Sequence, residues 1–106
     1  MISNDAIAQA VRILVDAAKP IKVILFGSYA TGNAQDDSDV DLLVVERGLR
    51  NTRAEMVRLR NLVRPLRIPV DIIVVSEDEF SDWAHLTGTV LHWAATEGRV
   101  MHEATA

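Results

Sequence analysis

The sequence predicts an α/β (α+β) fold, in which one β-sheet of three or four strands is covered by helices. Apolar runs of strand length occupy residues 21–26, 40–46 and 70–75, and each is bounded by glycine, proline or polar residues. The segments around these runs carry apolar residues at helical spacing. One sheet with helices on a face satisfies both patterns. The polar connection between the first two runs permits an antiparallel or a mixed sheet, and periodicity alone does not choose between them.

A first amphipathic helix is expected at residues 3–18. Ser3 is a suitable N-cap, and the apolar positions after it recur at helical spacing: Ile7, Ala10, Val11, Leu14 and Val15. Pro20 ends this helix, because the residue before a proline disfavours helical geometry. After the first strand, Gly27 and Ser28 form a sharp turn into a short helix or loop.

A second long helix is expected to start at Thr52, with Glu55 in the position of a capping box. Its buried face would consist of Met56, Leu59, Leu62 and Val63. The same helix carries a basic stripe: Arg53, Arg60 and Arg64. A solvated flank is the favoured interpretation of this stripe, and contact with a triphosphate or a partner protein is the alternative.

Ser76 and Glu79 form a second capping-box pair, at the start of a last helix that is expected to run to about Glu97. Gly98 would end this helix. A short edge strand is expected at residues 99–102.

Composition and charge exclude several classes of protein for this sequence. The length of 106 residues suits a single domain, residues 1–106, and the lack of cysteine excludes disulfides and thiolate metal sites. The apolar runs are too short to span a bilayer, and residues 1–5 lack the layout of a signal peptide. We therefore expect a cytoplasmic protein without a membrane partner. A net charge of −4 argues against bulk electrostatic binding to nucleic acid.

Three acidic residues lie in or beside apolar strand segments. Asp39 and Asp41 are two positions apart, so their side chains project from the same face of a strand. Two adjacent carboxylates repel each other unless a cation lies between them. Asp71 is a single acid within the third apolar run, where a charge needs a partner. If the second and third strands are neighbours, these carboxylates converge, and carboxylate oxygens are the ligands that Mg²⁺ takes.

The Gly27-Ser28 turn has the chemistry to complement such a metal site. Glycine allows the backbone to approach a ligand closely, and the helix start that follows presents free N–H groups to an anion. Ser28 adds a hydroxyl donor. The turn lacks the features of a Walker A loop or a dinucleotide fingerprint, so its significance depends on its fixed distance from the acids.

Two segments together carry a resemblance to a known family: Gly27-Ser28-Tyr29-Ala30-Thr31-Gly32 and Ser38-Asp39-Val40-Asp41-Leu42-Leu43-Val44-Val45. With this spacing the chain resembles the DNA polymerase β-type nucleotidyltransferase superfamily, and the resemblance covers nearly the whole sequence. Its small size makes it most similar to the minimal nucleotidyltransferases encoded beside HEPN-domain proteins in prokaryotic toxin–antitoxin pairs. The resemblance implies a mixed sheet with helices mainly on one face.

The resemblance also implies site residues and cofactors. Gly27 and Ser28 would hold the β- and γ-phosphates of ATP, the substrate. Asp39 and Asp41 would bind two Mg²⁺ ions when the nucleotide is present, and Asp71 would be the third carboxylate. The mechanism that follows from these site residues gives Asp71 the role of base. All five positions carry the residue type that the family pattern requires.

A partner is implied as well, because larger family members carry a helical domain that grips the acceptor and this chain does not show one. The implied reaction is transfer of AMP from ATP to a tyrosine of a HEPN-domain toxin, with this chain as the antitoxin. Two alternatives remain open: neutralisation of the partner by binding alone, and transfer to a small molecule. The sequence leaves open whether the chain forms a homo-oligomer or a hetero-oligomer.

Overall fold

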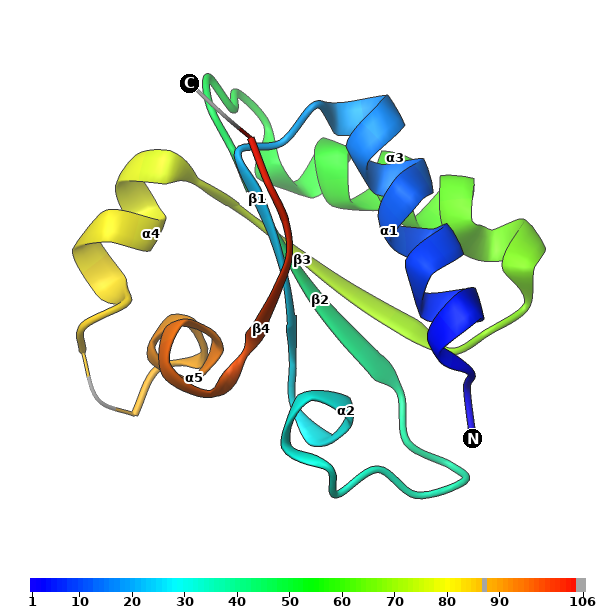
Figure 1. Ribbon diagram of the computed structural model, residues 1–106. Coiled ribbons are helices and arrows are strands. Elements are labelled where there is room, and N and C mark those ends of the chain that lie inside the picture. The colour runs from blue at the N-terminus through cyan, green and yellow to red at the C-terminus, as the bar shows by residue number, and fades with distance from the viewer. Residues whose placement is uncertain (87, 105–106) are drawn as a thin grey trace.

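The computed structural model describes residues 1–86 and 88–104. Its elements follow one another (Figure 1) as α1 (Asn4–Ala18), β1 (Lys22–Phe26), α2 (Ser28–Thr31), β2 (Val40–Glu46), α3 (Thr52–Val63), the 3-10 turn η1 (Arg64–Leu66), β3 (Val70–Ser76), α4 (Glu77–Trp83), α5 (Val90–Glu97) and β4 (Arg99–Glu103). The three apolar runs all form strands, with bounds within one residue of those expected, and the predicted edge strand is β4.

The strands form one mixed sheet in the order β3-β2-β1-β4. β1 is antiparallel to both of its neighbours, whereas β2 and β3 are parallel. The expected mixed sheet is therefore confirmed, and it settles the alternative that periodicity left open. Because β1 runs opposite to β2 and β3, the end of β1 and the beginnings of β2 and β3 lie at the same end of the sheet.

Helices cover both faces of the sheet, and the larger core lies under the two long helices (Figure 1). On the face of α1 and α3, the buried core consists of Ile7, Ala10, Val11, Leu14, Val23, Leu25, Val40, Leu42, Val44, Leu59, Val63, Ile72 and Val74. The shorter helices α4 and α5 lie over the other face, above a smaller cluster that consists of Ile24, Leu43, Val45, Val75 and Ala94. In the described residues, no helix is both long and apolar enough to cross a membrane.

Two of the predicted helix starts are confirmed in detail. Ser3 caps α1 by accepting a hydrogen bond from the backbone N–H of Ala6, at 3.1 Å. Ser76 and Glu79 form the full capping box of α4, because each side chain accepts from the backbone N–H of the other residue. Both starts follow the rule that a short polar side chain satisfies the free N–H groups of the first turn.

The prediction of one last helix up to Glu97 was wrong, because α4 ends at Trp83 and α5 starts only at Val90. Gly88 has φ +91°, a left-handed conformation that does not continue a helix. Thr89 then caps α5, since its Oγ1 accepts from the N–H of His92 at 3.1 Å. Thr87 belonged to the predicted helix and lies outside the described residues.

Two details of the middle helix were also predicted wrongly. The helix starts at Thr52 as predicted, but its N-cap is Asn51, whose side chain accepts from Ala54 N–H at 3.0 Å, so the expected capping box of Thr52 and Glu55 does not form. The carboxylate of Glu55 is bound instead by Arg58. Leu62 is 41% exposed, because α3 buries only a narrow stripe with Leu59 and Val63 at its centre.

A buried carboxyl lies at the other end of β2, away from the acidic residues singled out above. Glu46 is only 8% exposed, and hydrogen bonding to Glu55 and burial together raise its pKa from 4.5 to about 8. Burial is the larger cause. Arg58 holds Glu55 by two hydrogen bonds, at 2.7 and 2.9 Å, and lowers the pKa of that partner carboxyl.

Candidate active site

The strand directions bring the predicted site residues to one end of the sheet. In the register of the sheet, Asp41 on β2 is the direct partner of Asp71 on β3 and of Phe26 on β1. Gly27 and Ser28 follow Phe26 at once and lead into the four-residue helix α2. The turn after β1 and the first residues of two neighbouring strands thus meet in space, although up to 44 positions separate them along the chain (Gly27 to Asp71).

Asp39, Asp41 and Asp71 influence one another electrostatically. The pKa of Asp41 is raised, first by partial burial and then by the negative charges of Asp71 and Asp39. The alternation along β2 is as predicted, because the neighbours of Asp41 on either side, Val40 and Leu42, point into the core on the opposite face. Asp41 therefore projects from the face of the sheet opposite α1 and α3. Its charge there is unfavourable, because it is partly buried and is repelled by Asp71 and Asp39.

Gly27 adopts φ +74°, and a Cβ at this position would overlap Oδ2 of Asp41. Only glycine fits here, since any side chain would displace either the turn or the carboxylate. The carbonyl oxygen of Gly27 accepts from the N–H groups of Ala30 and Thr31, at 3.0 and 3.2 Å, and from Oγ1 of Thr31, at 3.4 Å. The turn is thereby fixed against Asp41.

The connection between the turn and β2 has a structural role. Ser38 N–H donates to the carbonyl of Gln35 at 3.0 Å, and Ser38 Oγ accepts from Gln35 N–H at 2.8 Å. Tyr29 packs against the larger core, and its hydroxyl accepts from the N–H of Ile2 at 3.0 Å. Neither residue contacts the carboxylates through these bonds, so both are explained by the stability of the loop.

Arg60 is a site residue whose contact the sequence did not reveal. Its Nη2 lies 3.3 Å from Oδ1 of Asp71 and 3.3 Å from the carbonyl oxygen of Ile72. Both charged side chains are about half exposed, at 48% and 52%. The interpretation of the arginine stripe as a solvated flank is therefore incomplete, because one member of the stripe contacts a predicted metal ligand. Finding this contact requires knowing that α3 packs beside β3.

The donor set suits a hard divalent cation that brings further ligands with it. Within the described residues, no three or more acidic or imidazole side chains gather into a complete metal site by themselves. Mg²⁺ does not need such a cage, since it usually takes one or two carboxylates and fills its shell with water and phosphate oxygens. The raised pKa of Asp41 also fits this ion, because a cation at that point would offset the repulsion among the carboxylates.

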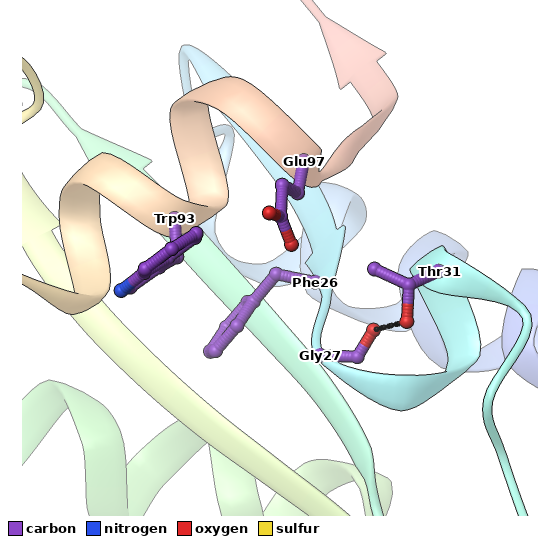
Figure 2. Close-up of a pocket in the computed structure, with 5 residues that line it drawn as sticks. All are labelled: Phe26, Gly27, Thr31, Trp93 and Glu97. Carbon is purple, nitrogen blue, oxygen red and sulfur yellow. Dashed lines mark hydrogen bonds between the residues drawn. The ribbon is translucent and has the colours of Figure 1, made fainter. Parts of the chain in front are cut away.

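A cavity of about 370 Å³ opens beside the turn, between β1, α2 and α5. Figure 2 shows its walls: Phe26 and Gly27 lie at the end of β1, Thr31 on α2, and Trp93 and Glu97 on α5. No sequence pattern indicated this cavity, because α5 was expected to be part of a longer helix. Trp93 is 48% exposed, so it is not part of the buried core.

Comparison with known proteins identifies the family. The family model described as "Nucleotidyltransferase domain" matches residues 7–92, which is most of the chain. The chain belongs to the nucleotidyltransferase domain family. The resemblance seen in the sequence is thereby confirmed, and all five predicted site residues lie within the matched segment of this nucleotidyltransferase.

One curated relative shares a short, strongly similar segment. It is a protein of Methanocaldococcus jannaschii that carries the provisional name of protein adenylyltransferase MJ1305, and it is 50% identical over 44 residues. The match covers 41% of this nucleotidyltransferase and 30% of the relative, so the chain spans less than a third of the relative's length.

Solved structures confirm the nucleotidyltransferase fold. A provisionally named nucleotidyltransferase from Sulfolobus solfataricus has a TM-score of 0.63 at 23% identity, over 93% of this chain and 78% of that one. A chain of a toxin–antitoxin structure with AMP-PNP gives 0.66 at 22% identity, over 98% and 76%. A chain of the tri-AMPylated Shewanella oneidensis HEPN toxin in complex with MNT antitoxin gives 0.60 at 20% identity, over 93% and 71%.

Proposed function

We propose that this nucleotidyltransferase transfers AMP from ATP to a hydroxyl group, that of a tyrosine, on a HEPN-domain partner, and that it acts as the antitoxin of that partner. One observation carries the proposal: Asp41 lies between Asp71, its register partner on β3, and Gly27, whose missing side chain leaves room for the carboxylate. A metal-binding edge and a phosphate-binding turn are thus in direct contact.

Each residue of the site has a role in this proposal. Gly27 and Ser28 hold the β- and γ-phosphates through the N–H groups that a helix start leaves without intrahelical acceptors, and through the Ser28 hydroxyl. Phosphate binding would depend on these individual N–H groups and not on a helix dipole, since α2 has only four residues and a correspondingly weak dipole. Asp39 and Asp41 supply carboxylate oxygens to Mg²⁺, two ions with the nucleotide bound, and Asp71 is the third carboxylate.

The transfer itself is an in-line displacement. The acceptor oxygen forms a bond to the α-phosphorus, the bond from that phosphorus to the bridging oxygen breaks, and pyrophosphate leaves. The proton of the hydroxyl passes to Asp71, which Arg60 holds in place on the acceptor side. When bound, Mg²⁺ lowers the pKa of the attacking hydroxyl and stabilises the charge on the leaving group. The remaining catalysis comes from positioning by the turn and the carboxylates.

The names of relatives support the choice of acceptor. One relative is named as a protein adenylyltransferase, and one structural neighbour belongs to a complex that contains an AMPylated HEPN toxin. Those descriptions apply to those proteins, and for this chain the partner is part of the proposal. The reaction needs ATP and Mg²⁺, and we place it in the cytoplasm.

A second candidate function is neutralisation of the partner by binding alone. It is favoured by two exposed apolar residues, Trp83 at the end of α4, at 51%, and Leu86 just beyond it, at 41%. Such side chains are typical of protein interfaces. They lie outside the carboxylate site, so they would serve a bound partner whether or not AMP is transferred.

Intact-mass analysis of the partner separates these two functions. The purified chain is mixed with its proposed HEPN-domain partner, ATP and Mg²⁺, and compared with the Asp41→Asn variant. Catalysis predicts a mass gain of one or more AMP units with wild type only. A partner that is neutralised but unmodified by wild type would support binding alone and would refute the proposed transfer.

A further inference from the structure

The cavity beside Gly27 has a composition that the transfer reaction does not explain. Trp93 and Glu97 are four positions apart on α5, so they lie on the same face of the helix, one turn from each other. In Figure 2 the Glu97 carboxylate points toward Phe26, and the Trp93 ring lies on the side of Phe26 that faces away from Gly27. These α5 residues follow the segment matched by the family model, which ends at residue 92. The family match therefore assigns them no role.

The chemistry of the walls defines the class of ligand. Two aromatic side chains, Phe26 and Trp93, offer flat apolar surfaces, and nucleic-acid bases stack on such surfaces. The Glu97 carboxylate only accepts hydrogen bonds, so the facing edge of the ligand must donate an N–H. A phosphate group would be repelled by this carboxylate. The cavity of about 370 Å³ thus suits an uncharged aromatic ring that carries an amine.

The direction of the in-line displacement indicates whether the donor nucleotide or the acceptor lies next to this cavity. In an in-line reaction the acceptor attacks from the side opposite the leaving pyrophosphate. In the proposed reaction the pyrophosphate rests on the Gly27 turn, so the acceptor would approach from β3, where Asp71 and Arg60 lie. The cavity lies on the Gly27 side. Its ligand is therefore a part of the donor nucleotide and not the acceptor tyrosine.

We propose that this cavity binds the base of the donor nucleotide, a purine stacked on Trp93 with its exocyclic amine donating to Glu97. The proposal rests on the proposed function and adds to it the residues that select the base. Contacts of the neighbouring His92 help to orient the Trp93 indole. His92 packs edge-on against Trp93, with ring centroids 5.8 Å apart, and Nδ1 of His92 lies 3.0 Å from the carbonyl oxygen of Ala84.

Tryptophan fluorescence tests the stacking. The sequence contains two tryptophans, so Trp83→Phe leaves Trp93 as the only reporter and Trp93→Phe leaves Trp83. Titration with ATP and Mg²⁺ should quench the Trp93 reporter and leave the Trp83 reporter unchanged. Trp93→Ala should weaken ATP binding about tenfold in calorimetry, with an unchanged circular dichroism spectrum.

Removal of the amine from the ligand tests the role of Glu97. Purine riboside triphosphate lacks the exocyclic amine of ATP, and wild type should bind it about tenfold more weakly than ATP. This difference should vanish in Glu97→Ala. It should persist in Asp82→Ala, which removes an exposed carboxylate from α4 outside the cavity.

The possible failures are distinguishable. If calorimetry detects ATP binding but Trp93 is not quenched, or if ATP and purine riboside triphosphate bind wild type equally, the base site is refuted while the proposed transfer stands. If ATP does not bind and no AMP reaches the partner, both are refuted.

Discussion

Asp41 occupies the space that a side chain on Gly27 would need, so the carboxylate and the backbone of the turn are in contact with nothing between them. In this nucleotidyltransferase, a substitution at Gly27 would displace the Asp41 carboxylate, and a shift of that carboxylate would affect the turn. The turn proposed to bind phosphate and the carboxylate proposed to bind metal thus form one unit, and this unit can be tested by substitution.

Replacement of Gly27 by alanine should abolish transfer. The new Cβ would overlap Asp41 Oδ2, and displacement of catalytic groups by about 1 Å can cost on the order of a hundredfold in rate. A matched control is Gly32→Ala, because Gly32 also has a positive φ, +81°, but a Cβ there meets nothing within 4 Å. Gly32→Ala should lose about 1–2 kcal/mol of stability from its left-handed conformation. Gly27→Ala should lose more, because φ +74° with ψ −155° is a region that essentially only glycine enters. Equal activity of the two variants would contradict a role for the contact.

Asp41→Asn should abolish transfer and leave the metal-free fold as stable as wild type or more stable. The substitution removes repulsion from Asp71 and Asp39, and like charges on paired strands cost a few tenths to about 1 kcal/mol. The raised pKa of Asp41 means that its stabilising contribution is present at low pH and is lost as the pH rises through that pKa. Thermal melts without Mg²⁺ should therefore show a gain that grows as the pH is raised from 4 to 8. Activity of the variant at saturating Mg²⁺ would refute the metal assignment.

Arg60→Ala should slow the transfer about tenfold by releasing Asp71, a positioning effect that leaves the fold intact. The free energy of unfolding should change by less than about 1 kcal/mol, because the ion pair is half exposed. Arg53→Ala is the control, since Arg53 lies on the same helix and is exposed. Steady-state kinetics distinguishes two roles: a lower kcat with an unchanged KM for ATP supports positioning, whereas a higher KM would indicate contact with the triphosphate.

Glu46 should make the stability of the fold depend on pH. Its pKa of about 8 lies above the ordinary 4.5, so the folded protein retains a proton that the unfolded chain releases. The resulting stabilisation is complete below pH 4.5 and is lost as the pH rises to about 8. Glu46→Gln cannot ionise and should be more stable than wild type at pH 9 by about 1 kcal/mol or more.

Melting curves of Glu46→Gln and wild type between pH 6 and pH 9 would measure this effect. The exposed residue Glu103 provides the control Glu103→Gln, which should follow the wild-type curve. Parallel curves for all three proteins would show that Glu46 titrates normally.

The sequence predicted best what depends on local patterns. The strand at Val40–Glu46 was predicted with its observed bounds, and the caps Ser3 and Ser76 were identified, because strand periodicity and capping are properties of a few adjacent residues. The predicted convergence of Asp41 and Asp71 required one further step, the pairing of β2 with β3, and the register provides it. The assignment of these residues to metal binding remains a prediction.

What the sequence missed depends on contacts between distant segments. Arg60 and Asp71 are eleven positions apart on different elements, and the buried pair of Glu46 and Glu55 joins a strand to a helix. The interruption near Gly88 was missed because the apolar spacing continues across it. Because the interruption was not predicted, α5 was not expected as a separate helix, and the cavity wall that carries Trp93 was not foreseen.

The opposed direction of β1 relative to β2 and β3 has a consequence for recognising proteins of this kind. The turn and the carboxylates meet through strand pairing, while residues 33–37 run outside this arrangement as a mostly exposed connection. Insertions or deletions in that connection would leave the geometry of the catalytic groups intact. A search pattern that demands a fixed gap between the glycine and the first aspartate would therefore overlook working enzymes, and a pattern with a variable gap would find them.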